Sequence, residues 1–162
     1  NNVKAVRGNP IAMRQAGRWE SPVPIYAIQA FHDKSRGAER GTTIVYSLEI
    51  GGIRITYLGD LGEIPDQGFL DRLSGTNVLL IPVGGVFTID HEDASRVMEL
   101  FRPSVAIPMH YKNKMVEWQL DGVEEFLAGK ERVRRFDTNW IELEEKDLPE
   151  PTEIWVLSPP GH

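Results

Sequence analysis

Residues 43–57 carry the pattern that most restricts the fold of this chain. Apolar and polar side chains alternate along residues 43–50 and again along residues 53–57, and Gly51-Gly52 joins the two runs. Alternation with a period of two predicts β-strands, and two glycines supply the positive φ angles that a two-residue hairpin turn requires. The sequence therefore predicts an antiparallel hairpin as part of a sheet.

The following part of the chain combines apolar runs with a helical pattern. Residues 78–83 (VLLIPV) form a continuous apolar run, which is typical of a strand covered on both faces. Residues 90–101 carry apolar side chains at helical spacing, and residues 105–109 form another buried run. A strand, a helix and a strand in this order predict a right-handed parallel crossover.

Shorter segments complete the predicted fold. A strand is expected at residues 25–31, and a polar loop follows it over residues 32–41. The remaining expected elements are helices at 3–6, 66–73 and 116–128, and strands at 10–13, 133–136, 140–143 and 154–157. Antiparallel and parallel segments together predict a single mixed α/β (α+β) domain over residues 1–162.

Composition and charge argue against several classes of function. No apolar stretch approaches about 20 residues, so a membrane span is not expected. The net charge of −6 and the lack of a basic stripe argue against nucleic-acid binding. The chain has no cysteine, which excludes disulfides and thiolate zinc sites and favours a reducing compartment such as the cytoplasm.

Three potential metal ligands stand just past the ends of predicted strands. His32 follows the strand at 25–31, Asp60 follows the hairpin, and His110 follows the run at 105–109. The spacings of 28 and 50 residues are too long for a zinc finger but suit a site assembled at one rim of a sheet. Two imidazoles and a carboxylate suit Zn²⁺, Fe²⁺ or Mn²⁺ better than Ca²⁺ or Mg²⁺.

Each of these positions also has an ordinary structural explanation. A Gly-Asp turn accounts for Asp60, and a histidine after a strand, such as His32, is often a surface or capping residue. Asp33 is interpreted as a turn former in preference to a partner that orients a histidine ring. His91 stands at the start of a predicted helix and is expected to be exposed to solvent.

A pair of glycines, Gly84-Gly85, follows the apolar run at 78–83. Glycines at the end of a strand can admit a phosphate or carboxylate to backbone N–H groups, but more often they allow close packing. Their spacing matches neither of the common glycine motifs for nucleotide binding. The sequence also lacks the G-x-S-x-G motif of serine hydrolases.

Four segments together resemble a known family. In chain order they are IYAIQAFHD, ITYLGDLG, VLLIPVGGVFTID and VAIPMHYK, at residues 25–33, 55–62, 78–90 and 105–112. Jointly they resemble the metallo-β-lactamase superfamily, in particular its UlaG-like branch of L-ascorbate-6-phosphate-lactonase-type hydrolases. The resemblance implies a four-layer αββα sandwich with a metal site at one rim, which holds two Zn²⁺ ions or, alternatively, Mn²⁺ or Fe²⁺.

The resemblance also implies roles for individual residues. His32 resembles the histidine that completes the first metal site, Asp60 the carboxylate that bridges the two metals, and His110 the histidine of the second site. The Gly84-Gly85 turn, Tyr111 and Lys112 would lie near the mouth of the substrate site. The implied reaction is attack of a metal-bound hydroxide on an ester, lactone or phosphoester-type bond of a small-molecule substrate.

One departure from the family is large. The principal ligand motif, H-x-H-x-D-H, is absent, and no two histidines lie closer than 19 residues. We therefore expect the chain to begin just after that motif and to lack the N-terminal part of the fold, which would expose apolar sheet and favour a homo-oligomer. The alternative function is a non-catalytic binding or regulatory module with an incomplete metal site. An RNA-processing nuclease is disfavoured by the acidic charge.

Overall fold

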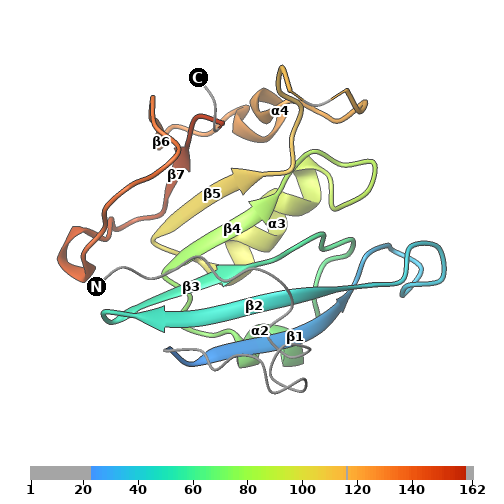
Figure 1. Cartoon of the computed structure of the whole chain (residues 1–162), viewed down its shortest axis with the longest axis horizontal. Helices are drawn as coiled ribbons and strands as arrows, with labels where there is room; N and C mark the ends of the chain where they lie inside the picture. Colours follow the sequence, from blue (N-terminus) through green and yellow to red (C-terminus); the bar gives the residue numbers. More distant parts are fainter. Residues whose placement is uncertain (1–22, 116, 160–162) are drawn as a thin grey trace.

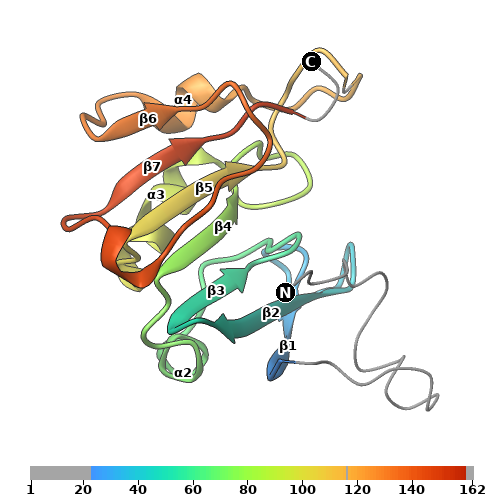
Figure 2. The same cartoon turned by 60° about the vertical axis from the view of Figure 1, so that its left-hand side comes forward.

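A sheet of seven strands organises the part of the chain that the computed structural model describes, residues 23–115 and 117–159. Its strand order is β1-β2-β3-β4-β5-β7-β6. The strands are β1 (Ile25–Phe31), β2 (Thr42–Ile50), β3 (Ile53–Tyr57), β4 (Val78–Pro82), β5 (Val105–Met109), β6 (Val133–Arg135) and β7 (Glu153–Val156). The helices are α2 (Gln67–Arg72), α3 (His91–Phe101), α4 (Val123–Leu127) and the 3₁₀ turn η1 (Glu145–Asp147). Figures 1 and 2 show α2 and α3 against one face of this sheet.

The direction of the strands sends several chain ends to one edge of the sheet. Strand β2 is antiparallel to both β1 and β3, so β1 and β3 are parallel to each other. Strands β3, β4, β5, β7 and β6 then pair in parallel. The predicted hairpin is confirmed, with φ of +58° at Gly51 and +81° at Gly52, and so is the parallel pairing across β4, α3 and β5. As a result, β1, β3, β4 and β5 all end at the same edge.

Apolar residues cover both faces of the central strands, as predicted for β4. Leu79 and Ile81 are fully buried on the face that packs against the helices, where Phe126 of α4 is also buried. Val78 and Val105 are buried on the other face, together with Trp155. The main core therefore lies between the sheet and its helices, and a smaller core lies on the opposite face.

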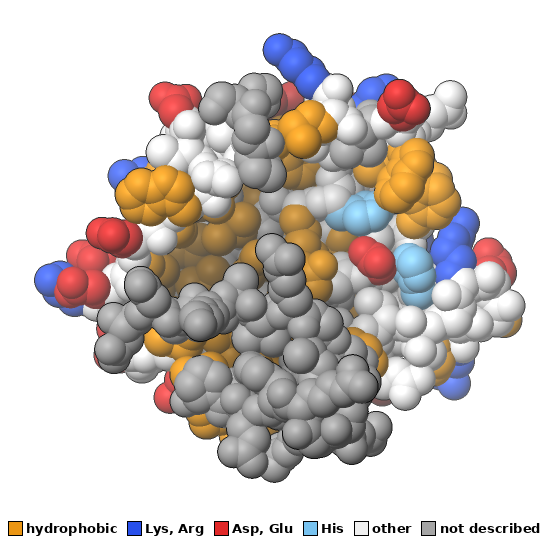
Figure 3. Space-filling model, in the orientation of Figure 1, with side chains coloured by type: hydrophobic (Ala, Val, Ile, Leu, Met, Phe, Trp, Pro, Cys, Tyr) orange, Lys and Arg blue, Asp and Glu red, His pale blue; other side chains and the backbone are white. Residues whose placement is uncertain are grey.

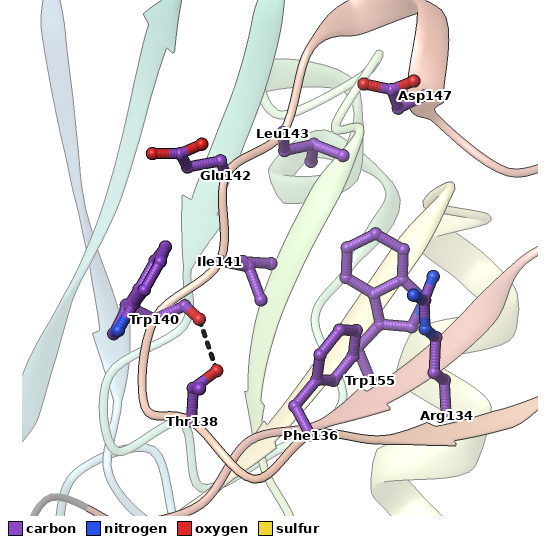
Figure 4. Close-up of a pocket in the computed structure, with 9 residues that line it drawn as sticks. All are labelled: Arg134, Phe136, Thr138, Trp140, Ile141, Glu142, Leu143, Asp147 and Trp155. Atoms are coloured by element: carbon purple, nitrogen blue, oxygen red, sulfur yellow. Dashed lines mark hydrogen bonds between the residues drawn. The ribbon is translucent and has the colours of Figure 1, made fainter.

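The opposite face is covered by the segment between β6 and β7. Ile141 and Leu143 of this segment pack on the smaller core, and the segment lines an open pocket of about 530 Å³ together with Arg134 and Trp155 (Figure 4). Tyr57, on the same face, is 39% exposed.

The mixed α/β class is confirmed. Of the four layers that the resemblance implies, the described residues form one sheet and the helices packed on it.

The helix expected at 116–128 is wrong in part, and the strand expected at 140–143 is wrong. Of the helix expected at 116–128, the described residues form only α4 (Val123–Leu127), because Asp121 bonds to other loops. Its N–H donates to the Gly84 oxygen (2.9 Å), and its backbone oxygen accepts from Lys112 N–H (2.8 Å). Residues 140–143 are irregular: Ile141 and Leu143 pack on the smaller core, but the backbone of the segment pairs with no strand. The elements expected at 3–6 and 10–13 lie outside the described residues. No helix among the described residues is both long and apolar enough to cross a membrane.

Candidate metal centre

The three predicted ligands all stand at the edge where the parallel strands end. His32 follows β1, Asp60 lies three residues after β3, and His110 follows β5. Figure 3 shows histidine and acidic side chains gathered on this part of the surface, beside hydrophobic ones. The sheet topology therefore places the three candidate ligands at one rim, as their positions after predicted strands indicated.

Asp60 and His110 lie close enough to share an ion. The Nε2 atom of His110 is 3.9 Å from Oδ1 of Asp60, and the two side chains are 21% and 47% exposed. Zinc lies 2.0–2.2 Å from nitrogen and oxygen ligands, so two ligands of one tetrahedral ion are roughly 3.4 Å apart. A movement of a few tenths of an ångström therefore suffices, and an imidazole with a carboxylate is a donor pair that divalent transition metals accept.

Positive φ angles occur at His110 itself and at Gly59, the residue before Asp60. His110 has a φ of +53°, which is uncommon outside glycine and is found where surrounding structure enforces it. The turn before Asp60 depends on Gly59, with a φ of +59° and with Thr43 Oγ1 only 2.7 Å from where a Cβ would lie. Thr43 also accepts a hydrogen bond from Asp60 N–H at 3.1 Å. The Gly-Asp turn thus holds the backbone of Asp60 against β2.

His32 lies at the same edge, but it does not complete a three-ligand cluster. Among the described residues, no group of three histidine, aspartate, glutamate or cysteine side chains is close enough to hold one ion. The Nε2 atom of His32 is buried and has no hydrogen-bond partner within the described residues. The structure therefore brings Asp60 and His110 together and leaves His32 as a separate buried nitrogen donor at the same rim.

Gly62 fixes the end of β1 against the loop that carries Asp60. Its N–H donates to the Phe31 oxygen at 2.9 Å. A Cβ at Gly62 would lie only 2.2 Å from the backbone nitrogen of Asp33 and the carbonyl carbon of His32. Any side chain larger than hydrogen would therefore force the two ligand-bearing segments apart.

Asp33 organises the loop that follows His32. Its carboxylate accepts four backbone hydrogen bonds of 2.7–3.2 Å, from the N–H groups of Ser35, Gly37, Glu39 and Arg40. Burial acts to raise the pKa of Asp33, but the four donors outweigh it and the pKa is lowered from 3.8. The interpretation of Asp33 as a turn former is confirmed.

This lowered pKa predicts a specific response to acid. Because the folded-state pKa of Asp33 is depressed, its contribution to stability is present above the unfolded-state pKa near 3.8 and is lost as the pH falls through the folded-state value. We expect Asp33→Asn to lower the melting temperature at pH 6 and to differ progressively less from the wild type below pH 3.8. Thermal melts from pH 6 to pH 2.5 measure this. Asp71→Asn is the control, and a constant difference between wild type and Asp33→Asn across the series would contradict the assignment.

The Gly84-Gly85 turn packs against the residue that carries the candidate imidazole. A Cβ at Gly84 would lie 2.1 Å from the His110 oxygen. Gly85 has a φ of +62°, and its N–H already donates to the Ile89 oxygen at 3.3 Å. Of the two interpretations that the sequence left open, the structure supports close packing.

Asp121 links the segments that carry Gly84, His91 and Lys112. The sequence analysis did not identify it, because it lies inside a predicted helix. Besides its bonds to Gly84 and Lys112, its Oδ2 lies 3.7 Å from Nδ1 of His91. The expectation of an exposed His91 is wrong in part, because this Nδ1 atom is buried although the side chain is 37% exposed. The dipeptide Asp121-Gly122 is a turn signal that could have corrected the helix prediction.

The two residues after His110 have different environments. The ring of Tyr111 packs on the main core, and burial raises the pKa of its hydroxyl. The side chain of Lys112 is exposed. Both follow the candidate ligand directly at the rim, so they remain candidates for the mouth of a substrate site.

Comparison with known proteins identifies the family. Residues 1–110, about two thirds of the chain, match the family described as the β-lactamase superfamily domain. A crystal structure from Thermotoga maritima is 34% identical to this chain and superposes with a TM-score of 0.72 over 83% of this chain and 64% of its own; its name proposes a zinc-dependent hydrolase of the metallo-β-lactamase superfamily. The chain belongs to the metallo-β-lactamase superfamily.

Curated superfamily members named UPF0173 metal-dependent hydrolases extend the similarity. The protein of Aeropyrum pernix is 34% identical over 152 residues, which are 94% of this chain and 52% of that protein. The protein of Carboxydothermus hydrogenoformans is 39% identical over 71 residues, 44% of this chain and 31% of that protein. A metal-dependent hydrolase from Parabacteroides distasonis shares the fold with a TM-score of 0.53 at 14% identity. The chain spans about half the length of the curated relatives it matches.

Proposed function

We propose that this chain carries part of the centre of a metal-dependent hydrolase, in which Asp60 and His110 bind one ion. The observation that supports this most directly is the 3.9 Å separation of His110 Nε2 from Asp60 Oδ1 at the end of parallel strands. The names of the superfamily relatives support the same reaction class. The strained backbone of His110 adds support, because such strain concentrates at functional sites.

A second ion would use Asp60 as a shared carboxylate and His32 as a separate ligand. The buried Nε2 of His32, which has no partner among the described residues, is available for this. Three ligands do not fill two coordination shells, so we propose that further ligands, equivalent to H-x-H-x-D-H, come from a segment other than residues 1–162. Zn²⁺ is the proposed ion, with Mn²⁺ or Fe²⁺ as alternatives.

The residues of this chain would have separate roles in binding the ion and the substrate. When bound, a divalent ion supplies Lewis acidity and lowers the pKa of a water molecule. Asp60 and His110 would hold the ion. Tyr111, Lys112 and the Gly84-Gly85 turn would lie at the mouth of the substrate site beside it. We propose a small-molecule substrate with an ester, lactone or phosphoester bond, as in the UlaG-like branch. A cytoplasmic location agrees with the lack of cysteine.

The second candidate function is a non-catalytic binding or regulatory module. The observation that favours it is that no three potential ligands gather in the described residues. A module of this kind would bind its ligand at the rim without hydrolysing it. The approach of Asp60 to His110 favours the enzyme, because a regulatory surface does not require a carboxylate beside an imidazole.

Hydrolysis in the presence and absence of metal separates the two functions. We expect protein that includes these further ligands to hydrolyse at least one of a panel of nitrophenyl esters, lactones and phosphodiesters. Prolonged treatment with EDTA should lower the rate by more than about 100-fold, and Zn²⁺ or Mn²⁺ should restore it, because the ion generates the nucleophile. Metal-saturated protein that hydrolyses none of the panel favours the binding module. A rate unaffected by EDTA contradicts the metal-dependent reaction.

A further inference from the structure

An apolar pocket adjoins the candidate ligand His110. Its volume is about 350 Å³, and His110 forms part of its wall. Met109, Leu120 and Leu157 line it, and Leu120 is buried. Apart from the imidazole, none of its lining residues has an ionisable group that is charged at neutral pH.

Trp118 forms the exposed wall of this pocket. Its side chain is 59% exposed, and its ring centre lies 6.5 Å from that of His110. On its other side it meets the ring of Phe87 edge to face, with 5.5 Å between ring centres. Figure 3 shows the hydrophobic side chains that gather beside histidine on this surface. Trp118 thus presents a large apolar surface to solvent, held in place by a second ring.

The pocket next to His32 has the opposite character. Its volume is about 290 Å³, and it is lined by charged side chains that include Lys34, Arg40 and Asp90. Lys34 contacts Asp90 at 3.6 Å and Asp93 at 2.6 Å, which joins the loop after β1 to α3. The rim therefore offers a charged pocket at His32 and an uncharged pocket at His110.

We infer that the pocket of His110 and Trp118 binds an uncharged, apolar acyl or aryl group of the substrate. This inference rests on the proposed function and narrows its substrate class to amphipathic molecules, whose polar end lies toward His32. An apolar group that enters the pocket removes the surfaces of Trp118 and Leu157 from water, which favours binding. A charged group would lose its hydration there and find no partner of opposite charge.

The first experiment measures binding without hydrolysis. The probe is N-hexylacetamide, which is uncharged and is not cleaved under the conditions of the titration, and its charged counterparts are hexanoate and hexylammonium. Calorimetric titration of the protein with EDTA present should show binding of the amide at least about tenfold tighter than that of either ion. Equal affinities for the three probes would overturn the inference.

Variants of two exposed tryptophans locate the binding. Trp118→Ala should weaken amide binding by about tenfold or more, while Trp118→Phe should retain most of it, because a ring remains. Trp140→Ala is the matched control, since Trp140 is 64% exposed but lines the pocket between β6 and β7. The same loss of binding in Trp118→Ala and Trp140→Ala would overturn the assignment.

The acyl-chain dependence of hydrolysis provides a second readout. The ratio of kcat/KM for nitrophenyl hexanoate to that for nitrophenyl acetate should exceed about ten in the wild type and approach one in Trp118→Ala. Amide binding without any hydrolysis would remove the proposed function and leave the pocket assignment in place. Hydrolysis with no preference for chain length, and no binding of the amide, would remove the pocket assignment and leave the hydrolase.

Discussion

Replacement of Gly84 by alanine is expected to destabilise the fold strongly. The new Cβ would lie 2.1 Å from the His110 oxygen and 3.0 Å from the Tyr111 Cα. Both are backbone atoms, so no side chain can rotate away, and the ends of β4 and β5 must separate. Overpacking of this kind costs about 3 kcal/mol. For a domain of this size that corresponds to a fall in melting temperature of roughly 6–12 °C.

The same movement would displace the candidate ligand. Val83 N–H donates to the Met109 oxygen at 3.0 Å, directly beside the clash, so a shift at Gly84 changes the distance from His110 to Asp60. Thermal unfolding measured by circular dichroism, together with metal affinity, follows both effects. Gly68→Ala is the matched control, because a Cβ there meets only Asp66 Oδ1 at 3.5 Å and the position is helical. Equal melting temperatures for the two variants would contradict the close approach.

The sequence was informative wherever a local pattern decides the structure. Alternating residues and Gly51-Gly52 predict the β2–β3 hairpin, and the buried runs predict the parallel pair of β4 and β5, all of which the structure contains. The shared location of the candidate ligands could be predicted from these elements, since residues that follow parallel strands lie at the same edge of a sheet. Asp33 as a turn former was also predictable, because a carboxylate before a polar loop has a local role.

The sequence failed where contacts between distant segments decide. The helix at 116–128 was expected from residue type alone. Inside a helix the backbone N–H and oxygen of Asp121 would bond to neighbouring turns, but here they bond to Gly84 and Lys112. The local sequence does not show that His110 approaches Asp60 while His32 stays apart from this pair. The packing role of Gly84 was likewise visible only once the neighbouring strand was placed.

Removal of Asp60 should have the largest effect on metal binding. If this carboxylate bridges two ions, Asp60→Asn lowers the affinity of both, whereas His110→Gln lowers that of one. We expect a loss of more than about 100-fold in each case, because removal of even an outer partner of a ligand costs 10–100-fold. Both substitutions nearly preserve side-chain size, and the side chains of Asp60 and His110 are 47% and 21% exposed, so we expect both variants to fold.

The most direct test of the metal centre is the metal content of the purified protein, its two ligand variants and His162→Ala, measured by elemental analysis after dialysis at limiting free zinc. For protein that includes the further ligands proposed above, the account predicts about two ions for the wild type and for His162→Ala, about one for His110→Gln and close to none for Asp60→Asn. Circular dichroism confirms that each variant is folded. Equal metal content in the wild type and in Asp60→Asn would contradict the assignment of this rim as the metal centre.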